Sequence, residues 1–78
     1  MSLVSLNMLQ PGEACRLDTL NLYGGFRRRL RDLGFLPGSR IECVLKAPGG
    51  SPIAFAVKGA LLALRVEECR NILVKRCE

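Results

Sequence analysis

The chain has 78 residues, enough for a single domain over residues 1–78 whose core buries about 60% of the surface of the unfolded chain. It contains no His and no Trp, so the commonest general base is missing and the composition argues against an enzyme. The 12 basic and 7 acidic residues give a net charge of +5, which favours an acidic protein surface, a nucleic acid or an anionic membrane face as partner.

No segment of the sequence has the length and hydropathy of a membrane span. The longest apolar run, Ala60–Leu64, is far shorter than the ~20 residues that a span needs. The first residues lack the basic start and long apolar stretch of a signal peptide. We therefore expect a soluble, cytosolic protein whose four cysteines are reduced thiols.

The first strand is predicted after a Pro-Gly turn. Residues 1–10 are mildly apolar and lead into Gln10-Pro11-Gly12-Glu13, a composition typical of a tight turn. In residues 14–18, Cys15 and Leu17 alternate with charged residues, which predicts a strand with these two side chains on its buried face.

An amphipathic helix is predicted next, ending at Leu33 or Gly34. Phe26, Leu30 and Leu33 recur at the spacing of one helical face, and the opposite face is basic. Gly34 is a natural C-terminal cap, because a residue without Cβ takes a positive φ at little cost. The chain that follows lets Phe35 fold back on Leu30.

A second turn leads into the next strand. Leu36-Pro37-Gly38-Ser39 has the composition of a type II turn, because Pro presets φ at the second position and Gly accepts positive φ at the third. The following strand starts near Arg40, and its period of two predicts that Ile41, Cys43 and Leu45 face the core.

The rest of the chain is predicted to form a loop, a hairpin with a two-residue turn, one helical turn and a closing strand. Pro and Gly mark the loop, Lys-Gly separates the two apolar hairpin strands, and an acidic pair marks the helical turn. In chain order these elements cover residues 47–52, 53–57, 58–59, 60–64, 66–71 and 72–75.

Together these elements predict a mainly β fold. About five short strands, one inserted α-helix and a short C-terminal helical turn describe a small, strongly bent sheet or partly open barrel. The core is expected on the buried side of each periodic pattern. Its predicted members are Leu17, Phe26, Leu30, Leu33, Ile41, Leu45, Ile53, Phe55, Leu64, Ile72 and Val74.

The cysteines are too far apart in sequence to indicate a metal site. Cys15, Cys43, Cys69 and Cys77 form no CxxC pair, and no His is present to complete a ligand set. The first three occupy inward positions, where Cys behaves as a small hydrophobic residue, and only Cys77 is expected to be exposed. We predict no metal ligand, no cofactor and no catalytic residue.

Four stretches, in order and in register over residues 6–76, resemble the FeoA family, ferrous iron transport protein A. They are Gln10-Pro11-Gly12-Glu13, Arg28-Arg29-Leu30-Arg31-Asp32-Leu33-Gly34-Phe35-Leu36-Pro37-Gly38, Ala47-Pro48 to Pro52-Ile53, and Ala63-Leu64-Arg65-Val66-Glu67-Glu68-Cys69 with Ile72 and Val74. The resemblance implies an SH3-like β-barrel and no catalytic residue. It also implies a cytosolic accessory role in bacterial ferrous iron uptake. The implied partner is the FeoB permease. The chain would be recruited to the membrane only indirectly, by binding this permease.

We therefore expect a regulatory protein that binds the cytosolic part of the permease and modulates GTP-driven Fe(II) transport. The expected partner surface is an exposed helix face with an apolar anchor in the adjoining turn, a composition that binding hot spots favour. A guanidinium on this face could also stimulate GTP hydrolysis by neutralising charge on the transferred phosphate. The surface residues are Arg27, Arg28, Arg31, Asp32, Leu36, Pro37 and Gly38.

The alternative function is a nucleic-acid-binding module built on a basic small barrel. Such modules stack bases on exposed aromatic side chains, and this chain has only Tyr23, Phe26, Phe35 and Phe55 to offer. We expect at least two of these in the core and no nucleic-acid partner. The sequence leaves open whether the module activates or inhibits transport, binds Fe²⁺ itself, or forms a weak homo-oligomer.

Overall fold

The computed structural model describes residues 2–77 and contains six strands, two short α-helices and two 3-10 turns. No helix in this range is long and apolar enough to cross a membrane. In chain order the elements are β1 (Val4–Ser5), the 3-10 turn η1 (Leu6–Met8), β2 (Ala14–Leu20), α1 (Gly24–Asp32), β3 (Arg40–Lys46), the 3-10 turn η2 (Pro48–Gly50), β4 (Ile53–Val57), β5 (Ala60–Leu64), α2 (Val66–Cys69) and β6 (Ile72–Arg76).

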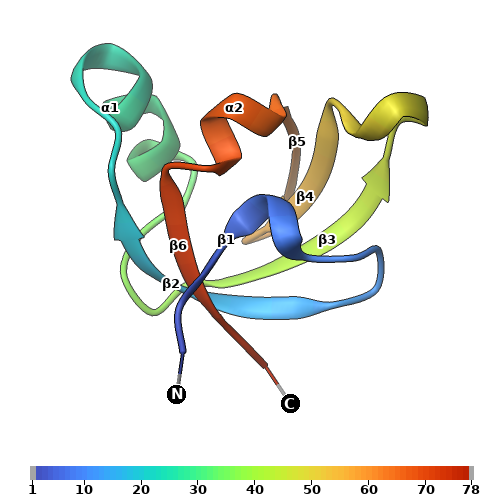
Figure 1. The fold of residues 1–78 in the computed structure, drawn as a ribbon. Helices are drawn as coiled ribbons and strands as arrows, with labels where there is room; N and C mark the ends of the chain where they lie inside the picture. Colours follow the sequence, from blue (N-terminus) through green and yellow to red (C-terminus); the bar gives the residue numbers. More distant parts are fainter. Residues whose placement is uncertain (1, 78) are drawn as a thin grey trace.

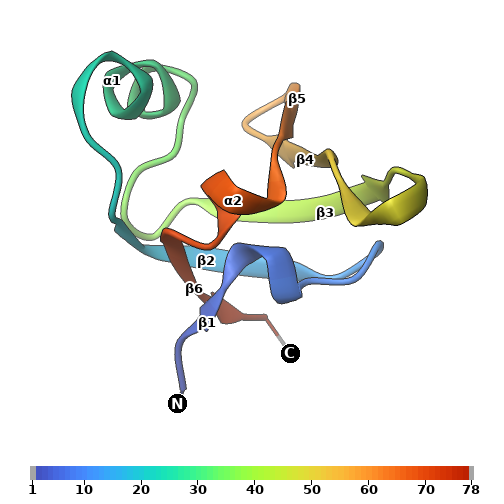
Figure 2. The same cartoon turned by 45° about the horizontal axis from the view of Figure 1, so that its top comes forward.

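All six strands form one antiparallel sheet in the order β1-β6-β2-β3-β4-β5. The sheet bends around a single core, with α2 lying across the curved sheet and α1 standing at the side away from the two chain ends (Figures 1 and 2). The mainly β prediction is confirmed, and the five expected strands all form. The sixth strand, β1, is a short addition that pairs with β6.

Helix α1 ends as predicted. Gly34 has a φ of +110°, its N–H donates to the carbonyl oxygen of Arg31 at 3.0 Å, and the Phe35 N–H donates to that of Leu30 at 2.9 Å. These two bonds make the Schellman motif, which satisfies carbonyl groups at the helix end. The motif also turns Phe35 back into the core, where it is fully buried.

The two predicted tight turns, one before β3 and one between β4 and β5, are also present. The Ser39 N–H donates to the carbonyl oxygen of Leu36 at 2.9 Å, and β3 begins at Arg40. Lys58 and Gly59 have φ values of 48° and 79°, the signs that a type I′ hairpin turn requires. The hairpin of β4 and β5 therefore has the predicted register, with Val57 opposite Ala60.

The core gathers one cluster of buried side chains from the strands, α1, α2 and the N-terminal segment. Eight of the predicted core residues are buried, and Phe26 is half-buried against the cluster. The buried residues are Leu6, Leu9, Cys15, Leu17, Leu30, Phe35, Ile41, Cys43, Ile53, Phe55, Val57, Leu64, Cys69, Ile72 and Val74.

Two predicted core residues are instead exposed, and both lie where a regular pattern stops. Leu45 is 61% exposed because the pairing of β3 with β4 shifts between Cys43 and Leu45, so that a β-bulge turns Leu45 to the outer face. Leu33 is 39% exposed because α1 ends at Asp32 and Leu33 is the C-cap, after which Phe35 takes the inward position.

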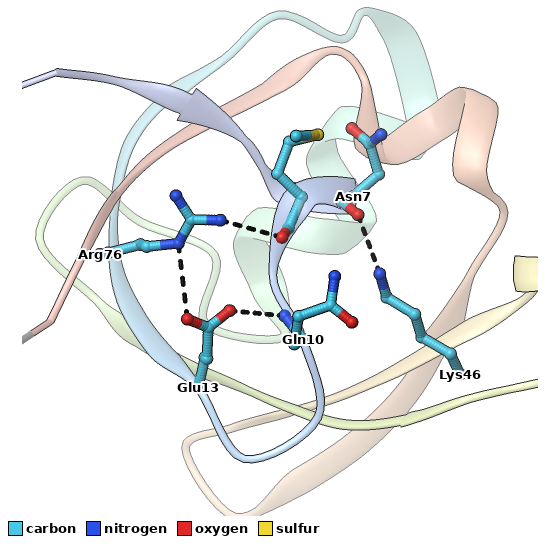
Figure 3. Close-up of polar contacts among 6 residues, drawn as sticks. Asn7, Gln10, Glu13, Lys46 and Arg76 are labelled. Carbon is cyan, nitrogen blue, oxygen red and sulfur yellow. Dashed lines mark hydrogen bonds and ion pairs between the residues drawn. The ribbon is translucent and has the colours of Figure 1, made fainter.

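The N-terminal segment, for which the sequence predicted no element, contributes two fully buried residues, Leu6 and Leu9. Figure 3 shows how polar side chains hold it in place. Arg76 donates to the carbonyl oxygen of Met8 at 3.0 Å and lies 3.6 Å from Glu13, whose other carboxylate oxygen accepts the Gln10 N–H at 2.7 Å. Lys46 donates to the carbonyl oxygen of Asn7 at 3.2 Å. These cations cap the carbonyl end of η1, as basic groups do at helix C-termini.

Candidate partner-binding surface

Helix α1 presents the basic face that the sequence predicted. Leu30 anchors the helix in the core, and this places Arg28, Arg31 and Asp32 on the exposed side, with Arg27 half-buried beside them. Within residues 2–77 the ion pairs are Arg40–Glu42 and Glu13–Arg76, so the charged groups of this helix are not neutralised by one another or by the barrel. Their charges are available to a partner.

Part of the predicted surface is gathered into two adjoining hollows. The larger, of about 550 Å³, lies between the end of β2 and α1 and is lined by Tyr23, Arg27, Arg31 and Pro37 among others. The smaller, of about 330 Å³, lies on α1 itself between its arginines and Asp32. Tyr23 is 87% exposed at the N-cap of α1, so an aromatic ring stands beside the arginines.

The other predicted residues of the turn face a third hollow, of about 680 Å³. Leu36 and Gly38 line it with Arg16, Arg40 and Lys58, which come from β2, β3 and the hairpin turn. Leu36 is half-buried, and the arginines around it belong to the sheet rather than to α1. Pro37 lines both large hollows and so joins the helix surface to the sheet surface.

The sequence missed Arg16, Arg40 and Lys58 as members of this surface, because they lie far apart in the chain. One clue was present in the sequence of β2, because the alternation with the inward Cys15 and Leu17 placed Arg16 on the exposed face. In the structure Arg16 pairs with Arg40 across the two strands and donates to the carbonyl oxygen of Gly38 at 3.3 Å. Arg40 lies 3.5 Å from Glu42, which leaves the group with a net positive charge.

Some of the basic charge on α1 also stabilises the helix. Arg29 and Arg31 occupy its last turn, where a positive charge interacts favourably with the helix dipole, an effect of about 0.3–1 kcal/mol for an exposed group. Arg27 and Arg28 lie nearer the N-terminal end, where a positive charge gains nothing from the dipole. The interaction with the helix dipole therefore accounts for only part of the basic charge on α1.

The cysteines lie as the sequence predicted, with Cys15, Cys43 and Cys69 buried and Cys77 exposed. Burial raises the pKa of Cys15 and of Cys69 to about 12, and it also raises the pKa of Cys43. Within residues 2–77, no His, Cys, Asp and Glu side chains gather into a group that could hold a metal ion. The three buried thiols are protonated at neutral pH and act as packing residues.

Thiol alkylation is expected to separate Cys77 from the other three cysteines. At pH 8 iodoacetamide should modify the folded protein once, at Cys77, because the other thiols are buried and protonated. In denaturant all four should react. Mass spectrometry counts the adducts, and rapid modification of Cys15 or Cys69 in the folded protein would contradict their placement in the core.

A bent six-stranded antiparallel sheet with one helix inserted between β2 and β3 defines a small SH3-like domain. The family model of the FeoA domain matches residues 4–76, so the chain belongs to the FeoA family, which is linked to ferrous iron transport. No curated protein matches the chain. The resemblance inferred from the four sequence stretches is confirmed.

Solved FeoA structures are similar over nearly the whole chain. The FeoA protein from Chlorobium tepidum is 31% identical with a TM-score of 0.91, over 96% of this chain and 71% of that one. FeoA from Stenotrophomonas maltophilia, a prokaryotic SH3 domain protein solved with zinc, is 30% identical with a TM-score of 0.80, over 92% of this chain and 89% of that one. IdeR from T. acidophilum shares the fold alone, at 17% identity and a TM-score of 0.83, over 99% of this chain and 35% of that one.

Proposed function

We propose that this chain is a small regulatory protein of bacterial ferrous iron uptake that works at the inner face of the membrane. It binds the cytosolic part of a FeoB-type permease and modulates GTP-driven transport of Fe(II). Membership of the FeoA family supports the proposal, and so does the description of the Stenotrophomonas maltophilia relative as a suggested ferrous iron transport activating factor.

The observation that carries the proposal is the exposed basic surface of α1 beside the turn at residues 36–39. It combines arginines that form no ion pair within residues 2–77 with an exposed tyrosine and the partly exposed apolar residues Leu36 and Pro37. Arg and Tyr are enriched at binding hot spots, and a net positive surface attracts an acidic partner surface over a long range. The surface therefore suits an acidic protein domain better than a small molecule.

The same geometry favours a protein partner over a nucleic acid and over catalysis. Phe35 and Phe55 are fully buried and Phe26 is half-buried, so Tyr23 is the one aromatic side chain left for stacking bases. A single-strand binding site needs several such rings along one face. The chain also has no His, the commonest general base, which supports a non-enzymatic role.

Reversing charge on α1 is expected to slow association with the permease. The double variant Arg28→Glu, Arg31→Glu should lower the association rate constant for the purified cytosolic domain of the permease by about tenfold at low salt, because electrostatic steering sets this rate. The difference should shrink as salt is raised. Surface plasmon resonance at two salt concentrations measures both effects.

A matched variant controls for net charge. The double variant Arg70→Glu, Lys75→Glu makes the same change in charge at two exposed positions, the C-cap of α2 and β6, and should bind nearly as the wild type does. Leu36→Ala should mainly raise the dissociation rate constant, since it removes a half-buried apolar group from the turn. If neither Arg28→Glu, Arg31→Glu nor Leu36→Ala changed the binding kinetics, the interface would lie away from α1 and its turn.

Regulation of GTP hydrolysis is measured with the same proteins. Turnover by the permease domain should change when the wild-type chain is added, and the change should be lost when Arg27, Arg28 and Arg31 are replaced by Ala. An arginine supplied in trans stabilises charge on the transferred phosphate and would raise the turnover of GTP. A rise in turnover means that the chain activates the permease, and a fall means that it inhibits the permease. Tight binding with unaltered turnover would leave the chain a docking protein and contradict the regulatory part of the proposal.

A further inference from the structure

The two edges of the sheet are protected to very different degrees. Edge strands expose unpaired N–H and C=O groups, and proteins normally guard them by shortness, charge, Pro or a bulge. At one edge β1 has only the two residues Val4–Ser5. At the other edge β5 has five residues, Ala60–Leu64, and none of them is charged or Pro.

The β5 edge also lacks a bulge. Register shifts interrupt the ladders of β2 with β6 and of β3 with β4, whereas the ladder of β4 with β5 runs without a shift from Val57–Ala60 to Ile53–Leu64. The strand is thus regular over its whole length. A regular, uncharged edge strand is a template for another strand.

The register identifies which backbone groups are free. A two-residue turn is closed by a hydrogen-bonded pair, here Val57 and Ala60, and such pairs alternate along an antiparallel ladder. The N–H and C=O groups of Leu62 and Leu64 therefore also face β4. Those of Leu61 and Ala63 point away from the sheet, and both residues have exposed side chains, with Leu61 67% exposed.

We propose that β5 pairs with β5 of a second copy of the chain, antiparallel and about a two-fold axis at Leu62. This register sets Leu61 of one copy opposite Ala63 of the other, and the symmetry repeats this pair on the other side of the axis. The free N–H and C=O groups of both residues then form hydrogen bonds with the second copy. The exposed Leu61 and Ala63 side chains then cover one another on the outer face. The apolar sequence of the strand is self-complementary in this arrangement.

The apolar composition of β5 favours a second copy at this edge. The chain carries a net charge of +5, which opposes contact between copies over most of the surface, but β5 itself is neutral. The residues that flank the strand, Lys58 in the hairpin turn and Arg65 before α2, are both basic and exposed. The pairing therefore rests on the backbone groups and apolar side chains of β5 and not on ion pairs.

The contact is small, and the expected dissociation constant is on the order of 100 μM, as for other weak and transient interfaces. Sedimentation velocity of the full chain from about 10 μM to about 1 mM should show a reversible monomer–dimer equilibrium. Reductant is present throughout, because a disulfide through the exposed Cys77 would imitate a dimer. A wild-type chain that stays monomeric over this range would overturn the proposal.

Two variants test the edge itself. Ala63→Pro removes an outward N–H without touching the bonds to β4, and Leu61→Lys places like charges close together across the axis; each should raise the dissociation constant at least about tenfold. Leu45→Lys is the matched control, because Leu45 is equally exposed on the outer face but lies on β3, two strands from the edge. It should dimerise as the wild type does. Melting temperatures confirm that each variant is folded.

Amide hydrogen exchange gives a readout at single residues. In the monomer the amides of Leu61 and Ala63 should exchange quickly, and both should become protected as concentration rises, whereas the amide of Leu62 is protected at every concentration. Equal loss of dimer in Leu45→Lys and Leu61→Lys would indicate stacking of sheet faces and overturn edge pairing. Protection of Leu61 and Ala63 only when the permease domain is added would assign the edge to that partner and likewise refute self-association.

Discussion

Truncation of Leu30 to Ala is expected to lower the free energy of unfolding by about 2–5 kcal/mol. Leu30 is 1% exposed and is the buried residue through which α1 enters the core, so the variant leaves a cavity in the core and removes the anchor of the helix. A domain of this size has a stability of only about 5 kcal/mol. Urea denaturation followed by circular dichroism should therefore show a variant that is largely unfolded or close to it.

Leu33→Ala is the matched control for that measurement. It makes the same chemical change three residues further along the chain, but Leu33 is the partly exposed C-cap of the helix and should cost less than about 1 kcal/mol. The pair of variants tests the end of the helix as well as the core. Equal losses of stability would mean that α1 continues through Leu33 and packs with both residues.

Replacement of Gly34 by Ala is expected to destabilise the protein by about 1–3 kcal/mol, the usual cost of holding a side chain at positive φ. Gly34 has a φ of +110°, and a Cβ there would lie 3.0 Å from Cδ of Lys58, so the Lys58 side chain would also have to shift. The loss should appear as a lower urea midpoint with an unchanged slope.

Gly25→Ala provides a control of opposite sign. Gly25 lies in the first turn of α1, has no positive φ, and no atom lies within 4 Å of a Cβ built on it. Ala restricts the unfolded chain and fits the helix, so this variant should gain about 0.4–1 kcal/mol. If both substitutions shifted stability in the same direction, the assignment of helical φ to Gly25 and positive φ to Gly34 would be contradicted.

Features that depend on a few neighbouring residues could be predicted from the sequence. The stop at Gly34, the turn before Arg40 and the hairpin turn at Lys58-Gly59 each follow from the conformations open to Gly and Pro, and all three are present. The same holds for the inward phase of Cys15 and Ile41, where alternation was regular. In these segments local preference and tertiary packing agree.

Features that depend on distant partners could not be predicted. The bulge that exposes Leu45 arises from the pairing of β3 with β4, and nothing in the alternation of β3 alone marks it. Leu6 and Leu9 are too few to show a period, and their segment is held by contacts to Lys46 and Arg76. The hollow around Leu36 was missed for the same reason, because its basic residues come from separate strands.

The pairing of β1 with β6 fixes the order in which the domain can be completed during synthesis. Val4 pairs with Val74, and Arg76 reaches the Met8 carbonyl across 68 positions of sequence, so the ribosome must release nearly the whole domain before these bonds form. Contacts so distant in sequence form slowly, because a long loop must close first. Until then Leu6 and Leu9 lack their contacts with the C-terminal strand, so the N-terminal segment completes its packing last.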